Sequence, residues 1–250
     1  LAIIALIQPW IIAIWKKFFR PLKVTFIPSA KIKLYYNRSG AYIYLGGVIE
    51  AKNRSAVIKD ISAKVIRQSD KAELVMDWSS FMVPVFQSIG GNAVTTSEIA
   101  RSFMVSANGL NPIFVEFANT DTQLNDELNR IHEKIKLETR RICNINIPFD
   151  CAEQQLQEIS EYQRFREELL ENFYWKTSKY VIELSIHHSD DKTEICRYQF
   201  SLSQEETTEF KRNIDEAMLC ELKMLYYQPV CFSIIQKDFA VLKNNASIVE

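Results

Sequence analysis

Histidine, cysteine and carboxylate side chains are the groups that could do acid–base or metal chemistry, and this chain groups few of them. His187 and His188 are adjacent, Asp190 and Asp191 follow, and Cys196 comes shortly after. A zinc site needs a tetrahedral set of such ligands around one point. Neighbouring side chains on a strand point to opposite faces, so the two histidines are poorly placed to share an ion. We interpret this run as a polar hairpin end, and we expect no metal and no cofactor.

Patterns for nucleophilic catalysis or phosphate binding are also missing from the sequence. It has no G-x-S-x-G elbow, no H-E-x-x-H pair and no P-loop, and it has only six glycines. Cys143 follows two arginines, but it comes at the expected end of a helix, where the dipole opposes a thiolate. The adjacent carboxylates Glu167 and Glu168 do not share a helix face. The sequence therefore favours a protein that is not an enzyme. His188 and Asp190 are the candidates for the less favoured enzymatic alternative.

The amino-acid composition further narrows the classes of function that are possible for this chain. The chain has 250 residues, a formal net charge of −1 and 47% hydrophobic residues, enough for a packed core. A nucleic-acid binder normally has a basic excess, so we expect no nucleic-acid partner. An odd number of cysteines without CxxC spacing indicates free thiols in a reducing compartment. The five are Cys143, Cys151, Cys196, Cys220 and Cys231.

Residues 1–20 give the strongest indication of where the protein is located in the cell. From residue 1 to residue 15 the only polar side chain is Gln8, and charge then arrives abruptly. A membrane-spanning helix needs about 20 apolar residues, so this run is short, but its basic and aromatic flank is typical of one. Because the chain begins with leucine, we expect further residues upstream. A signal peptide would have the reverse order of basic and apolar residues, and a buried or amphipathic helix is the other alternative. The predicted anchoring residues are Trp10, Trp15, Lys16, Lys17 and Arg20.

This basic cluster also predicts an orientation. Lysine and arginine beside a membrane helix stay on the cytoplasmic side. We therefore expect a single-pass membrane protein in which everything after Pro21 is cytoplasmic.

Strands and helices would position any site, and the spacing of apolar residues changes along the chain between the pattern of a strand and that of a helix. Alternation of apolar and polar residues predicts strands over residues 31–36, 41–52, 56–67, 71–78, 102–107, 113–117, 180–186 and 194–202, with a buried strand at 230–235. The pair Gly46-Gly47 predicts a bulge or a close backbone approach. Spacings of three and four predict helices over residues 121–143, 150–175 and 204–226, with capping boxes at Asp150 and Ser203. Residues 81–97 are expected to form a long loop or edge segment.

These elements predict a mainly β fold with an α insertion. We expect an antiparallel β-sandwich, immunoglobulin-like in outline, over residues 21–239, with a helical hairpin inserted at 121–175. A helix at 204–226 and a tail at 240–250 complete it, and residues 1–20 form the membrane anchor. The alternative is an all-β domain to Thr120 followed by an α+β domain from Asp121. Four tyrosines, at 35, 36, 42 and 44, could line a ligand surface, but core packing and cross-strand pairing is favoured.

The function that these features favour is a non-enzymatic, membrane-anchored cytoplasmic interaction or assembly module. It would act through protein–protein contacts in a membrane complex, with the membrane bound through residues 1–20 and with protein partners or copies of itself. The alternative is a membrane-coupled sensor or effector of a small ligand, for example in a stress or host-defence system. An enzyme of unfamiliar type is less favoured.

Overall fold

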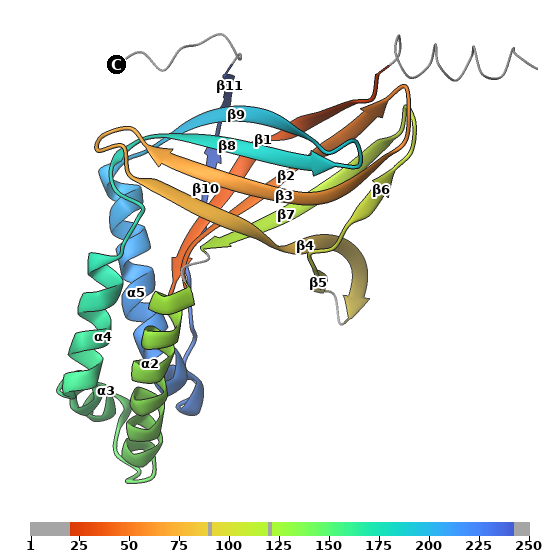
Figure 1. Ribbon diagram of the computed structural model, residues 1–250. Helices are drawn as coiled ribbons and strands as arrows, with labels where there is room; N and C mark the ends of the chain where they lie inside the picture. Colours follow the sequence, from red (N-terminus) through yellow and green to blue (C-terminus); the bar gives the residue numbers. More distant parts are fainter. Residues whose placement is uncertain (1–20, 90–91, 120–121, 243–250) are drawn as a thin grey trace, which may run out of the picture.

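The computed structural model describes residues 21–89, 92–119 and 122–242. Within these ranges the chain forms eleven strands and four helices (Figure 1). The strands are β1 (Lys23–Asn37), β2 (Gly40–Lys52), β3 (Ala56–Arg67), β4 (Glu73–Ile89), β5 (Asn92–Ile99), β6 (Phe103–Val105), β7 (Leu110–Asn119), β8 (Ser178–His188), β9 (Lys192–Leu202), β10 (Ile235–Asp238) and β11 (Ala240–Leu242). The helices are α2 (Thr122–Cys143), α3 (Phe149–Gln157), α4 (Ser160–Glu171) and α5 (Gln204–Leu225).

All of these strands belong to one antiparallel sheet, which is nearly closed and barrel-like. The spatial order is β10-β1-β2-β7-β4-β3-β8-β9-β11, with β5 paired to β4 and β6 paired to β3. The predicted β-sandwich is therefore corrected, since the described strands form one curved sheet and not two sheets face to face. Alternation along a strand tells which face is buried, but it is the same in a sandwich and in a curved sheet.

The segment after α5 spans the two edges of the sheet. Its first part, β10, pairs with β1, and its second part, β11, pairs with β9. Only Phe239 separates the two strands, and its ring lies edge-on to Tyr198 of β9 at 5.2 Å. Two sequence expectations are wrong here. The chain is irregular from residue 230 to residue 234, and the expected unstructured tail contains β11.

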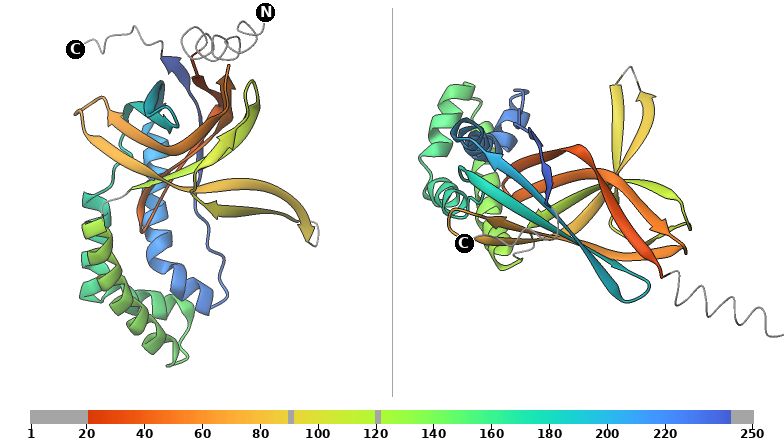
Figure 2. Two further views of the ribbon diagram at one scale, coloured as in Figure 1. Left: turned by 45° about the vertical axis from the view of Figure 1, so that its right-hand side comes forward. Right: turned by 90° about the horizontal axis from the view of Figure 1, so that it is seen from above.

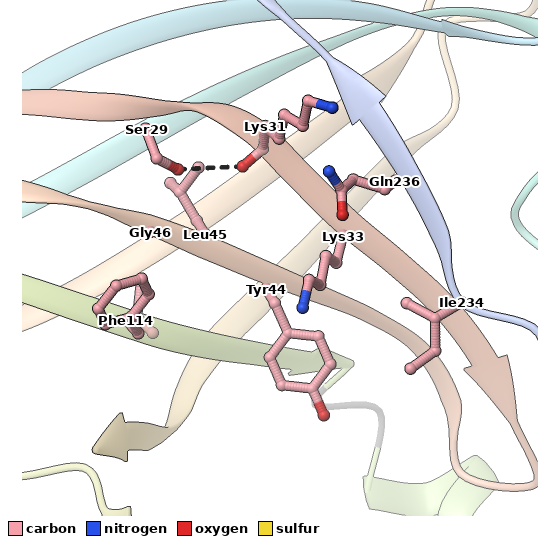
Figure 3. Close-up of a pocket in the computed structure, with 10 residues that line it drawn as sticks. Ser29, Lys31, Lys33, Tyr44, Leu45, Gly46, Phe114, Ile234 and Gln236 are labelled. Atoms are coloured by element: carbon pink, nitrogen blue, oxygen red, sulfur yellow. Dashed lines mark hydrogen bonds between the residues drawn. The ribbon is translucent and has the colours of Figure 1, made fainter. Parts of the chain in front are cut away.

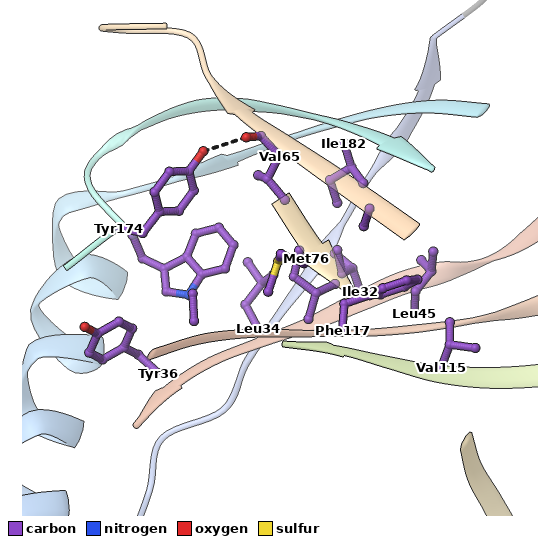
Figure 4. Packing of buried hydrophobic residues seen from close by; sticks show 14 of the residues in the cluster. Ile32, Leu34, Tyr36, Leu45, Val65, Met76, Val115, Phe117, Tyr174 and Ile182 are labelled. Atoms are coloured by element: carbon purple, nitrogen blue, oxygen red, sulfur yellow. Dashed lines mark hydrogen bonds between the residues drawn. The ribbon is translucent and has the colours of Figure 1, made fainter. Parts of the chain in front are cut away.

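The core fills the inside of the curved sheet. On β8, alternate residues from Tyr180 to His188 are buried, as the period-two pattern predicts. Figure 4 shows side chains of β1, β2, β4 and β7 packed together. Trp175, which follows α4, is fully buried there, and its indole Nε1 donates to the carbonyl of Tyr35 at 3.1 Å. This contact ties the end of the helical segment to the sheet.

The four described helices form a lobe at one end of the sheet (Figure 1). The predicted helical hairpin is in fact α2, α3 and α4, because the chain turns between Gln157 and Ser160. Pro148, not Asp150, is the N-cap of α3, and no side-chain cap bond is found there among the described residues. The helix predicted at 204–226 is confirmed as α5, and so is the capping box of Ser203 and Glu206. After α4 the chain returns to the same sheet, where β8 pairs with β3.

The described part of residues 81–97, expected to be a long loop or an edge segment, is mostly strand. The ends of β4 and β5 pair as a two-stranded ribbon that projects from the sheet (Figure 2). The pairing register shifts between Val83 and Gln87, which is where Pro84 lies. Proline lacks an N–H group, so it is tolerated at such an irregularity. The expected loop is therefore wrong, and the alternative of an edge segment is closer, because among the described strands β5 pairs with β4 alone.

Candidate functional site

The predicted membrane anchor lies outside the described residues, and so do its side chains Trp10, Trp15, Lys16, Lys17 and Arg20. Among the helices that the structure describes, none has the length and apolarity needed to cross a membrane.

The two adjacent histidines point to opposite faces of β8, as predicted. His188 points inward and its side chain is fully buried, with its Nε2 4.0 Å from Oε1 of Glu194. Neither ring nitrogen has a hydrogen-bond partner within the described part of the chain. His187 points outward, and its Nδ1 lies 2.8 Å from the hydroxyl of Thr193. The fold therefore does not bring the two imidazoles together.

The neighbouring carboxylates are used in ion pairs. Asp190 accepts from Arg54 at 2.6 Å, and Asp191 accepts from Lys59 at 2.5 Å. These pairs join the turn between β8 and β9 to β3 and to the turn before it. In the described ranges no three His, Cys, Asp or Glu side chains lie close enough together to hold a metal ion.

All five cysteines lie in the described ranges and are free thiols. Cys143 is partly buried at the end of α2, as expected. Burial, with the nearby carboxylate of Glu221, raises the pKa of its thiol. A thiol with a raised pKa is less reactive than a thiol of ordinary pKa, because the thiolate is the nucleophile.

The first surface with a site-like shape is a hollow of about 540 Å³ on the outer face of the sheet (Figure 3). It extends over β10, β1, β2 and β7, and the irregular segment before β10 lies beside it. The side chains that give it its chemistry are Lys31, Lys33, Tyr44, Phe114, Ile234 and Gln236.

A glycine lies at the floor of this hollow, against the ring of Phe114. A Cβ atom on Gly46 would lie 2.8 Å from Cδ1 of Phe114, so the ring occupies space that a side chain would need. Opposite this glycine, β1 carries extra residues, and the register shifts between Pro28 and Ile32. The predicted bulge or close approach at the glycine pair is thus confirmed, with both features present.

The tyrosines beside the hollow form a stack across β1 and β2. The ring of Tyr35 lies 4.4 Å from Tyr42 and 5.2 Å from Tyr44, and both pairs are nearly parallel. The hydroxyl of Tyr44 donates to that of Tyr35 at 3.3 Å. Burial, together with the nearby carboxylate of Glu116, raises the pKa of Tyr44 to about 12. The prediction of core packing and cross-strand pairing is therefore confirmed, because three of the tyrosines stack across the strands and Tyr36 points into the core.

The second surface is the tip of the helical lobe, at the end of α5. Tyr227 follows the C-cap residue of this helix and has a φ of 55°, in the left-handed region. Its N–H donates to the carbonyl of Met224, and the N–H of Gln228 donates to that of Lys223. This is a Schellman motif, whose left-handed position is usually glycine. Tyr227 is nevertheless 96% exposed.

Other apolar side chains are exposed at this end of the lobe. Met224, Leu225 and Ile145 are each about half exposed. Ile145 belongs to the connection between α2 and α3, and this connection meets the end of α5 where the hydroxyl of Tyr226 donates to the carbonyl of Ile147 at 2.8 Å. We call Ile145, Met224, Leu225 and Tyr227 the apolar tip.

Sequence reasoning identified neither surface. The alternation over residues 31–36 placed Lys31 and Lys33 on one face, and the glycine pair was noted, but nothing indicated that β10 would lie beside them. The apolar tip left no signal, because Tyr227 comes where the helical pattern has already ended.

No family model matches this chain. No curated protein shows significant sequence similarity to it.

Proposed function

We propose that this protein is a non-enzymatic, membrane-anchored module that acts through protein–protein contacts made by the apolar tip. The observation that carries the proposal is Tyr227, a large aromatic residue held in a left-handed conformation and almost fully exposed. A non-glycine residue pays about 1 kcal/mol for this conformation. Residues in such conformations are held by the surrounding structure and cluster at functional sites.

The chemistry of the tip suits a protein partner. Tyrosine is enriched among the residues that dominate binding at protein interfaces, because it offers a rigid apolar ring with a polar end. Met224 and Leu225 add apolar surface beside it, and methionine adapts its shape to a partner. The proposed occupant is therefore a protein surface with an apolar pocket for the Tyr227 ring.

The position of the tip supports the same proposal. The start of β1 lies at the end of the sheet away from the helical lobe (Figures 1 and 2). With residues 1–20 anchored in a membrane, the lobe would project away from it. A cytoplasmic partner, or the lobe of a second copy, could then reach the tip without contact with the bilayer.

The test uses the substitution Tyr227→Gly, which separates stability from binding. Glycine suits the left-handed position, so the free energy of unfolding should rise by up to about 1 kcal/mol. The apolar ring is lost, so partner binding should fall. The matched control is Asn146→Gly, because Asn146 also has a positive φ, 57°, and lies in the connection beside the tip.

The measurement is co-purification of the full chain from its own membranes in mild detergent, quantified by mass spectrometry for wild type and both variants. The proposal expects a partner, or a second tagged copy, that is retained by Asn146→Gly and depleted at least about tenfold by Tyr227→Gly, the size of effect typical of an aromatic hot spot. If the recovered proteins are the same for all three, the tip is not the contact surface and the proposal fails.

A further inference from the structure

We infer that the hollow on the outer face of the sheet binds a small amphipathic anion, which carries a carboxylate or phosphate group on a compact apolar body. The hollow lies on the sheet and shares no residue with the apolar tip. The inference therefore does not depend on the proposed lobe contact.

The size of the hollow suits a small molecule. Its volume is about 540 Å³, and small-molecule pockets in proteins are typically roughly 300–1,000 Å³. The convex face of a sheet rarely offers such a space. Here the ring of Phe114 lies in the space that a side chain on Gly46 would fill, and the segment before β10 forms one side.

The walls supply an apolar contact surface. Phe114 is 44% exposed and Ile234 is 57% exposed, and the ring of Tyr44 lies between them in Figure 3. Apolar surface left in water is unfavourable by about 25 cal/mol per Å². A flat or compact apolar body that covers these three side chains would remove this cost.

The polar side of the hollow is positively charged. Lys31 and Lys33 lie on the same face of β1, and neither has an ion pair with another described residue. Asp238 stands opposite Lys31 in the β1–β10 register, but the ammonium group of Lys31 and the carboxylate of Asp238 do not form an ion pair. The amide of Gln236 adds a neutral donor beside Lys33. Figure 3 shows the two ammonium groups turned in different directions on long side chains, and rotation of these side chains toward an oxyanion would let it accept charge-assisted hydrogen bonds from both.

The hollow is also held open before any ligand arrives. Ser233 precedes Ile234 and exchanges two hydrogen bonds with the buried side chain of Asn213 in α5. The hydroxyl of Ser29 donates to the carbonyl of Lys31 at 3.1 Å and fixes the extra residues of β1 (Figure 3). A preformed site loses less conformational entropy on binding.

The test uses 4-(trifluoromethyl)benzoate as the probe, followed by ¹⁹F NMR line broadening. The full chain is reconstituted in nanodiscs of zwitterionic phospholipid, and empty nanodiscs give the blank. The neutral analogue 4-(trifluoromethyl)benzyl alcohol tests the need for charge, and inorganic phosphate as a competitor tests the need for the apolar body. The key variant is the double substitution Lys31→Met and Lys33→Met. Lys179→Met, an exposed lysine on the outer face of β8, is the control.

The inference expects the benzoate to bind to wild type and to the Lys179→Met control alike. Affinity should fall at least about tenfold in the double variant and for the alcohol, because charge-assisted hydrogen bonds are lost. Phosphate should compete only weakly. Equal binding of the alcohol, equal loss in the control, full competition by phosphate, or no benzoate binding at millimolar concentration would each overturn the inference.

A last arm identifies the source of the anion. The measurement is repeated in nanodiscs that contain an anionic phospholipid. Loss of the benzoate signal would assign the hollow to a lipid headgroup, and an unchanged signal would assign it to a soluble amphipathic anion. Either result supports the shared chemistry, provided that the double variant has abolished binding in zwitterionic nanodiscs.

Discussion

Asn213 and Ser233 exchange two hydrogen bonds: Nδ2 of Asn213 donates to the carbonyl of Ser233 at 2.8 Å, and Oδ1 accepts from its N–H at 2.7 Å. Asn213 is 1% exposed on α5, whereas Ser233 belongs to the irregular segment between α5 and β10. The side chain of Asn213 thus satisfies the backbone N–H and carbonyl of Ser233, as a neighbouring strand would. It attaches the helical lobe to the wall of the hollow.

The first prediction concerns this pair. Asn213→Ala leaves the backbone N–H and carbonyl of Ser233 without their partner, and we expect a loss of about 1–3 kcal/mol in the free energy of unfolding. The measurement is equilibrium denaturation of the full chain in one membrane mimic. Asn172→Ala is the control, because the Asn172 side chain makes an exposed bond to the carbonyl of Glu168. Equal effects of the two substitutions would contradict the role given to Asn213.

The second prediction concerns the adjacent histidines. His188 is buried without a hydrogen-bond partner among the described residues, so its polar ring costs stability. His188→Leu should keep or raise the free energy of unfolding, by up to about 1 kcal/mol. His187→Leu should lower it slightly, because the bond to Thr193 is lost. Denaturation curves of both variants check the opposite signs. A large loss in His188→Leu would mean that the imidazole has a partner, such as a bound ligand.

The third prediction concerns pH and the joint between sheet and lobe. Nη1 of Arg38, in the turn after β1, lies 2.8 Å from Nδ1 of His132 in α2. Burial, and then the charge of Arg38, holds the pKa of His132 down at about 4, below its ordinary value of 6.5. The unfolded chain takes up this proton at a higher pH than the folded chain does. The contribution to stability is therefore complete above pH 6.5 and is lost as the pH falls through 4.

The variant His132→Gln isolates this effect, since glutamine does not titrate and its side-chain oxygen can still accept from Arg38. The free energy of unfolding, measured at several pH values between 7 and 4, should fall less steeply in the variant than in wild type. The same slope in both proteins would show that His132 does not sense this change.

Local sequence patterns predicted the parts of this fold that depend on neighbouring residues. Alternation identified the buried face of β1, β3, β8 and β9, and the spacing at residues 204–226 identified α5 with its Ser203 cap. These succeed because a strand or helix face is defined by residues close in sequence.

Long-range pairing could not be predicted in this way. The closure of the sheet depends on β10 and β11 reaching β1 and β9, and these short strands have little pattern of their own. The hollow combines residues from four strands, and the apolar tip depends on the single conformation of Tyr227. The His187 and His188 result differs, since opposite faces on one strand follow from local geometry alone.

The last prediction concerns the glycine pair, whose two members should respond differently to alanine. A Cβ on Gly47 would lie 2.4 Å from Cζ of the buried Phe26 and 2.7 Å from the carbonyl oxygen of Ile27. A Cβ on Gly46 would meet Phe114, whose ring is 44% exposed and can turn outward. Gly47→Ala should therefore cost about 2–3 kcal/mol, as overpacking in a core does, and Gly46→Ala less than about 1 kcal/mol. Denaturation of the two variants measures this difference.

A double-mutant cycle identifies what resists the new methyl group at Gly47. Phe26→Leu removes the ring that blocks it, but it leaves the carbonyl of Ile27 in place. The double variant Phe26→Leu with Gly47→Ala should therefore be more stable than the sum of the single effects predicts, by about 1 kcal/mol, since residues in contact couple by this amount. Additive effects would instead show that the backbone carbonyl alone makes glycine necessary, because removal of the ring would then have relieved nothing.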